Sequence, residues 1–129
     1  MIKLTVKELV DSVEAFQTIM QQELKGSFAF RCARLKREVL KELEIFENQR
    51  DALVQKYALR DENGEIIKGE NENTIRLDPQ KIDECDKEYQ AILDVEVEIN
   101  AEKFRMEDAD AFNITPQQME YLLPFFEEE

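Results

Sequence analysis

The chain has 129 residues, and thirty acidic against seventeen basic side chains give it a formal charge of −13. This length is typical of one domain, so we expect a single domain over residues 1–129. The negative charge disfavours direct binding to nucleic acid and to anionic membranes. No apolar stretch reaches the length of a membrane span or has the form of a signal peptide, so we expect a cytoplasmic protein.

The first predicted element is a helix over residues 5–24. Thr5 and Glu8 have the spacing of a capping box, in which each side chain accepts a hydrogen bond from the other residue's backbone. The apolar residues that follow are four, three and four positions apart: Leu9, Val13, Phe16 and Met20. This spacing places them on one helical face. We expect Gly26 to end the helix in the left-handed conformation.

A longer helix is predicted over residues 27–60, because this stretch contains neither glycine nor proline. Its apolar residues follow a helical period: Phe28, Cys32, Leu35, Val39, Leu43, Phe46, Leu53 and Tyr57. A helix of this length is longer than a compact domain of this size needs. We therefore expect it to organise the molecule, with the first helix folded back on it as an antiparallel hairpin.

Beyond residue 60 the pattern changes. Residues 61–64, DENG, form a turn signal, and we expect positive φ at both Asn63 and Gly64. Short apolar runs over 65–68 and 74–77 then predict two strands of a small β-hairpin, with a partly mobile excursion of the chain as the alternative. A helix over 79–93 follows, with Asp78 as its cap. Alternating residues predict strands over 95–99 and 103–106, and a helix capped by Thr115 covers 116–126.

The expected fold is therefore mainly α with a minor β part, that is, α+β. It consists of an antiparallel helical hairpin built on one long helix, a small β-hairpin or sheet and a short C-terminal helix. We expect Cys32 and Cys85 to be core residues, since each occupies an apolar helical position.

The residues needed for common catalytic sites are missing. The chain contains no histidine and only three glycines, which argues against a general base near neutral pH and against a phosphate-binding loop. We therefore expect no catalytic residues, no cofactor and no metal, and we interpret the protein as a non-enzyme. A magnesium or calcium site drawn from Glu96, Glu98, Asp108 and Asp110 is the weaker alternative. The simpler interpretation is that Glu96 and Glu98 form the solvated face of a strand.

Charge is distributed unevenly along the chain. Residues 27–41 carry five basic side chains against the single acid Glu38, whereas residues 61–102 carry fourteen acids against four bases. One explanation is internal pairing between these segments. The other is that the basic end docks a partner of opposite sign. The basic residues that would carry such docking are Arg31, Arg34, Arg37 and Lys41.

Two pairs of phenylalanines offer candidate anchors for an interface. Phe28 and Phe30 lie about 200° apart around a helix, so only one of them can face the core. Phe125 and Phe126 are adjacent, and we expect the same conflict there. Core packing explains most of these rings, but an exposed one would mark an interface. The candidate partner-binding set therefore adds Phe30, Phe125 and Phe126 to the basic residues.

Six segments in this order resemble a family of small helical proteins encoded by phages and prophages, which has no assigned activity. They are KLTVKEL (3–9), LVQKY (53–57), DENG (61–64), LDVEVEI (93–99), ITP (114–116) and LLPF (122–125). The resemblance implies a phage or prophage accessory or assembly protein in a bacterial cytoplasm. We expect a protein–protein interaction module that binds a protein partner or itself. The alternative is an acidic inhibitor that mimics the charge of nucleic acid against a host defence or nucleic-acid-binding enzyme.

Overall fold

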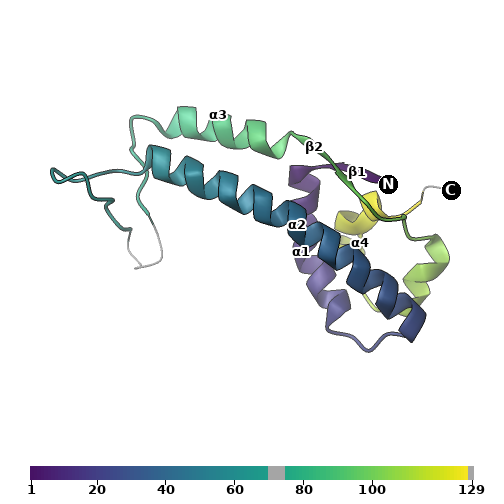
Figure 1. The fold of residues 1–129 in the computed structure, drawn as a ribbon. Coiled ribbons are helices and arrows are strands. Elements are labelled where there is room, and N and C mark those ends of the chain that lie inside the picture. Colours follow the sequence, from purple (N-terminus) through teal and green to yellow (C-terminus); the bar gives the residue numbers. More distant parts are fainter. Residues whose placement is uncertain (70–74, 128–129) are drawn as a thin grey trace. The chain divides into compact units, whose positions relative to one another are not determined.

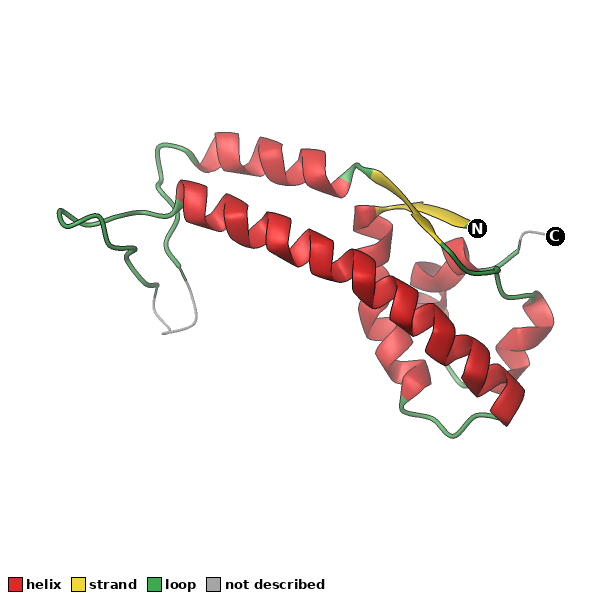
Figure 2. Ribbon diagram, in the orientation of Figure 1, coloured by secondary structure: helices red, strands yellow, loops and turns green. Residues whose placement is uncertain are grey.

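A computed structural model describes residues 1–69 and 75–127 of the chain. The regular elements, in chain order, are β1 (Ile2–Thr5), α1 (Val6–Met20), α2 (Gly26–Tyr57), α3 (Ile82–Leu93), β2 (Glu96–Ile99), η1 (Met106–Ala111), α4 (Pro116–Leu122) and η2 (Leu123–Phe125), where η marks a 3₁₀ helix (Figures 1 and 2). The predicted α+β class is confirmed: helices dominate, and the two strands form one antiparallel sheet.

The chain divides into two compact units. Unit 1 comprises Met1–Glu44 and Asp94–Glu129, and unit 2 comprises Ile45–Leu93. Helix α2 contributes its first half to unit 1 and its second half to unit 2. That the chain forms a single domain stays a prediction.

In unit 1, the sheet pairs β1 with β2, and Ile2 lies opposite Ile99 in the register. Both of these isoleucines are buried, whereas the facing pair Lys3 and Glu98 is exposed and forms a 3.6 Å ion pair. The predicted alternation is therefore confirmed over Glu96–Ile99, but Val95, the first residue of the predicted strand, is exposed and lies outside it. The predicted partner over 103–106 is wrong. The true partner, β1, begins near the other end of the sequence, so the pairing depends on tertiary contacts rather than on a local turn.

Helix α1 begins with the predicted capping box. The Thr5 hydroxyl accepts a hydrogen bond from the Glu8 amide at 3.2 Å, and the Thr5 amide donates to the Glu8 carboxylate at 3.0 Å. The helix ends at Met20, earlier than expected, and Gly26 is the first residue of α2 rather than a left-handed terminator. The closest packing of α1 is against α4, with the Gln118 amide donating to the Thr18 hydroxyl at 3.2 Å.

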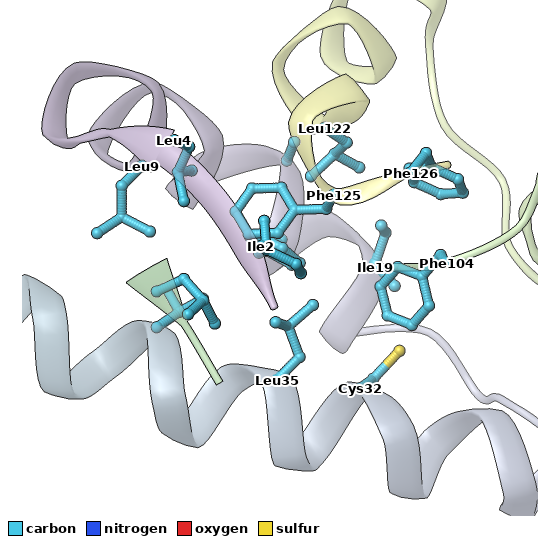
Figure 3. Close-up of a cluster of buried hydrophobic side chains, with 14 of the residues drawn as sticks. Ile2, Leu4, Leu9, Ile19, Cys32, Leu35, Phe104, Leu122, Phe125 and Phe126 are labelled. Atoms are coloured by element: carbon cyan, nitrogen blue, oxygen red, sulfur yellow. The ribbon is translucent and has the colours of Figure 1, made fainter. Parts of the chain in front are cut away.

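The predicted apolar residues of α2 are buried, apart from Leu43, which is half-buried. In unit 1 these residues join α1, the sheet and the C-terminal segment in one core (Figure 3). Buried members of this core include Leu9, Phe28, Cys32, Leu35, Val39, Ile99 and Phe104. Burial of this many large apolar side chains is the main force that stabilises unit 1.

Unit 2 has a smaller core. One cluster in it has Leu53, Tyr57 and Cys85 as buried members, with Leu77, Tyr89 and Ile92 half-buried against them. The other buried apolar residues of the unit are Phe46, Ala58 and Leu93. Helix α3 begins at Ile82 rather than near residue 79, because residues 78–81 form a separate turn in which the Lys81 amide donates to the Asp78 carbonyl.

Residues 58–69 and 75–77 contain isolated bridges in place of regular strands. Ala58 pairs with Leu77, Arg60 with Ile66, and Lys68 with Ile75, all antiparallel. The long predicted helix therefore stops at Tyr57, since Ala58–Arg60 pair as extended chain. In the turn, Gly64 alone has positive φ, at 80°, so the prediction for Asn63 is wrong. Thr74, within the predicted strand 74–77, lies outside the described residues.

Candidate interaction surface

The first half of α2 presents a row of candidate residues to solvent. Phe30, Arg34, Arg37 and Lys41 are exposed and are spaced four, three and four positions apart. This spacing places them on one helical face, away from the buried positions Phe28, Cys32, Leu35 and Val39. We call these four exposed residues the outer face of α2. Their alignment follows from the same period that predicts the buried seam.

Phe30 is the exposed ring that the sequence predicts for this helix. Phe28 occupies the core, where it lies 5.4 Å from the Phe104 ring between centroids, and Phe30 is 64% exposed. The Arg34 guanidinium lies 6.0 Å from the Phe30 ring centroid, within the range of a cation–π contact. The aromatic ring and the cation therefore form one exposed amphipathic patch.

Arg31 is held in a defined position. Its guanidinium donates to the Asp108 carboxylate at 3.0 Å and lies 5.1 Å from the Phe104 ring centroid. Partial burial of Asp108 would raise the pKa of its carboxyl. The hydrogen bonds from the Arg105 amide and from Arg31, with the charges of both arginines, lower that pKa below its usual range. Arg31 is thus committed to an internal ion pair.

Lys41 is also paired, because its ammonium lies 3.1 Å from the Glu38 carboxylate. The partners of Arg31 and Lys41 are therefore Asp108 and Glu38, and neither belongs to the acidic segment 61–102. Within residues 1–69 and 75–127, no ion pair involves Arg34 or Arg37. Two of the four predicted basic residues thus keep guanidinium groups open to a ligand.

A groove of about 450 Å³ runs beside this surface in unit 1. Arg31, Arg34, Arg37 and Glu38 line it from α2, and Asn100 and Glu102 line it from the segment that follows β2. The structure therefore brings three of the predicted basic residues into one concave site, leaving Phe30 and Lys41 outside its lining.

The two C-terminal phenylalanines are both core residues, so the expectation that adjacent rings cannot both turn inward easily is wrong, and they form no exposed anchor. Phe125 is 0% and Phe126 4% exposed. The conflict expected for adjacent rings disappears because η2 ends at Phe125 and Phe126 is extended. Phe125 then packs edge-on against Phe16 at 4.7 Å between centroids, and Phe126 packs against Phe104 at 5.6 Å.

The same geometry corrects two predicted elements. The helix expected over 116–126 divides into α4 and η2. The strand expected over 103–106 is a single parallel bridge between Phe104 and Phe126, after which η1 begins at Met106. The Phe104 amide donates to the Phe125 carbonyl at 2.8 Å, and the Glu127 amide donates to the Phe104 carbonyl at 2.7 Å.

The acids considered for a metal site have other environments. Glu96 and Glu98 are exposed on β2, and Asp108 accepts hydrogen bonds from Arg31 and Arg105. Among the residues that the structure describes, no group of three or more acids or cysteines is arranged to hold a metal ion.

Both cysteines are buried and free. Burial raises the pKa of the Cys32 thiol to about 11, and it also raises the pKa of the Cys85 thiol. A thiolate is the reactive form, so both thiols are poor nucleophiles at neutral pH. The prediction that they are core residues is confirmed.

Sequence reasoning missed the second wall of the groove. Asn100 and Glu102 gave no signal, because they meet α2 only after β2 has paired with β1. Comparisons of the chain with family models, with curated proteins and with solved structures each gave no match. Across the described parts of the chain, no helix is long and apolar enough to cross a membrane.

Proposed function

We propose that this chain is a non-enzymatic protein–protein interaction module, acting as a phage or prophage accessory or assembly protein. The observation that carries the proposal is the exposed Phe30 ring beside Arg34 on the outer face of α2. Aromatic and arginine side chains are enriched in protein interfaces and among the few residues that dominate the binding energy. A large apolar ring in water has no role in the core of unit 1, which Phe28 already fills.

The position of this patch also supports the proposal. It lies on the helix half whose opposite side is anchored by Cys32, Leu35 and Val39 in the core of unit 1. A rigid helical surface loses little conformational entropy when a partner binds to it. The outer face of α2 is therefore suited to recognition without rearrangement of the backbone.

A direct test measures the molar mass of assemblies by size-exclusion chromatography with light scattering, after chemical cross-linking in a bacterial lysate. We expect the wild-type protein to form a defined oligomer or a defined complex, and Phe30→Ala to lose it. The matched control is Tyr121→Ala, since Tyr121 is an aromatic residue of α4 that is 43% exposed. A strictly monomeric protein that forms no complex, or equal losses for both variants, would contradict the proposal.

The second candidate is an acidic inhibitor that mimics nucleic acid. It is favoured by the exposure of most described acids in residues 61–102, among them Glu62, Asp83, Glu84 and Asp86. The basic residues Arg31 and Lys41 take their ion-pair partners from outside that segment. This candidate predicts binding to a basic enzyme that weakens steeply with salt and is unaffected by Phe30→Ala.

A further inference from the structure

We infer that the groove beside α2 binds an acidic segment of a protein partner in extended conformation, with Arg34 and Arg37 as the carboxylate ligands. The inference rests on the proposed function, because it names the chemistry of the partner. It adds a defined site, which the outer face of α2 alone does not provide.

The arginines of the groove have different roles. Arg31 is held by Asp108 at 3.0 Å and covers Phe104, so it positions the wall of the groove. Arg34 and Arg37 are exposed and, within residues 1–69 and 75–127, take part in no ion pair. A guanidinium presents two parallel N–H groups that match the two oxygens of a carboxylate. These two side chains are therefore the ones that can bind the carboxylates of an acidic ligand.

The spacing of the two ligands matches an extended peptide. Residues three positions apart on a helix have Cβ atoms about 5–6 Å apart. In an extended chain, side chains two positions apart point to the same side and lie about 6.6 Å apart. A peptide with acids at alternate positions can thus bring one carboxylate to Arg34 and the next to Arg37.

The rest of the lining favours a peptide over a phosphate backbone. Glu38 and Glu102 also line the groove, and the whole chain carries a formal charge of −13. Both features repel anions, and they repel a continuous row of phosphates more strongly than a short peptide with few carboxylates, which can place these groups at the arginines. Asn100 adds an amide that can donate to and accept from a peptide backbone. The groove volume of about 450 Å³ lies within the usual range of ligand sites.

The test is fluorescence anisotropy of the full chain with a labelled hexapeptide of alternating glutamate and serine. Its control is the same peptide with glutamine in place of glutamate. We expect saturable binding of the acidic peptide only, and Arg34→Ala or Arg37→Ala to weaken it about tenfold. The matched variant is Lys36→Ala, which removes the same charge from an exposed position of α2 outside the groove lining. We expect it to change the affinity by less than about twofold, since it affects only the screened long-range field.

The inference fails if the acidic peptide does not bind saturably, and three further results would also overturn it. The first is equal binding of the glutamine peptide, and the second is an equal loss of affinity in Lys36→Ala. The third is tighter binding of a single-stranded oligonucleotide, which would assign the groove to phosphate. Failure of the proposed function is detected in a different experiment, the size-exclusion measurement, in which Phe30→Ala would then form the same assembly as the wild-type protein. Peptide binding without assembly would support the groove as a binding site and contradict the proposed interaction module. Assembly without peptide binding would support the module and contradict the peptide site.

Discussion

The two units of the chain differ in how their cores are built, although they share one helix. In unit 1, sixteen of the described residues, drawn from α1, α2, both strands and the C-terminal segment, form one buried cluster. In unit 2, six of the described apolar residues are buried, and three of them, from α2 and α3, form a cluster with half-buried neighbours around it. A helix with a regular apolar period can therefore contribute to two cores of different size. The sequence of the helix alone does not reveal where one core ends and the other begins.

The difference bears on function, because the candidate groove belongs entirely to unit 1. The groove walls are backed by the larger core, which includes Leu35 and Phe104. Side chains supported in this way keep their positions, which reduces the entropy lost on binding. Unit 2 offers exposed acids but a small core. We therefore expect unit 1 to hold the recognition site and unit 2 to be the less stable part.

The largest effect should come from Phe125→Ala in unit 1. This ring is fully buried and packs edge-on against Phe16, so its loss leaves a cavity between α1 and η2. We expect the free energy of unfolding in urea to fall by about 3–5 kcal/mol. A loss below about 1 kcal/mol would show that the core of unit 1 tolerates rearrangement and does not dominate stability.

A matched pair on α2 compares the two cores directly. Leu35 is 2% exposed in unit 1, and Leu53 is 7% exposed in unit 2. Leucine-to-alanine changes in cores cost about 2–5 kcal/mol, depending on how many neighbours surround the cavity. We expect Leu35→Ala to lie near the upper end and Leu53→Ala near the lower end, measured by urea unfolding. Equal losses would contradict the difference between the cores.

These comparisons also show how far the sequence could predict the fold. The buried seam of α2 was predictable because its residues are close in sequence and share one period. In α1 the helical period was predicted correctly, but the buried face of the helix is rotated from the predicted one. Leu9 and Phe16 are buried as expected, yet Ile19 is buried where Met20 was predicted. Packing against α4 determines this direction, and that contact is remote in sequence.

The remaining errors have the same origin. Strand β1 has four residues, and its partner begins at Glu96, so no local pattern marks the pairing. Phe104 was assigned to a strand because it alternates with charged neighbours, but it pairs with Phe126. The outer face of α2 was predictable, as the exposure of Phe30 shows. The groove was not, since its second wall depends on the β1–β2 pairing.

The two cysteines sharpen the comparison, because each unit contains one buried thiol. Labelling by a thiol reagent requires local opening, and opening free energies differ between parts of a protein. We expect Cys85 to react at least about tenfold faster than Cys32, a difference of about 1.4 kcal/mol. Single-cysteine variants, Cys32→Ala and Cys85→Ala, separate the two rates. Both rates should rise with pH, since the thiolate is the reactive form and burial keeps both thiols protonated in the folded state at neutral pH. Equal rates would indicate that the units open together.

The smallest expected effects come from substitutions of two acidic residues, one in each unit. Asp108 in unit 1 is partly buried and accepts hydrogen bonds from Arg31 and from the Arg105 amide, whereas Glu88 in unit 2 forms an exposed pair with Lys56 at 2.7 Å. We expect Asp108→Ala to lower the free energy of unfolding by about 1 kcal/mol, as loss of a helix cap does. Glu88→Gln should give no measurable change, because solvent screens an exposed pair.

The pH dependence follows from the lowered pKa of Asp108. The folded state favours the ionised carboxylate, so its contribution is complete above the unfolded pKa and is lost as pH falls through the folded pKa. Urea unfolding at neutral and acidic pH should therefore show a loss on acidification that Asp108→Ala reduces. Glu88→Gln should reduce it less, because the hydrogen bond from Lys56 that lowers the pKa of Glu88 is exposed to solvent screening. An unchanged acid dependence in Asp108→Ala would show that Asp108 does not contribute to the pH dependence of stability.

The most direct test of the central claim, that unit 1 recognises an acidic partner through the groove beside α2, is a two-dimensional ¹H–¹⁵N NMR titration. The full chain is titrated with the hexapeptide of alternating glutamate and serine. We predict saturable amide shifts concentrated in residues 30–41 and 100–104, reduced in Arg34→Ala. Shifts concentrated in residues 45–93, or no saturable shifts at all, would contradict the claim.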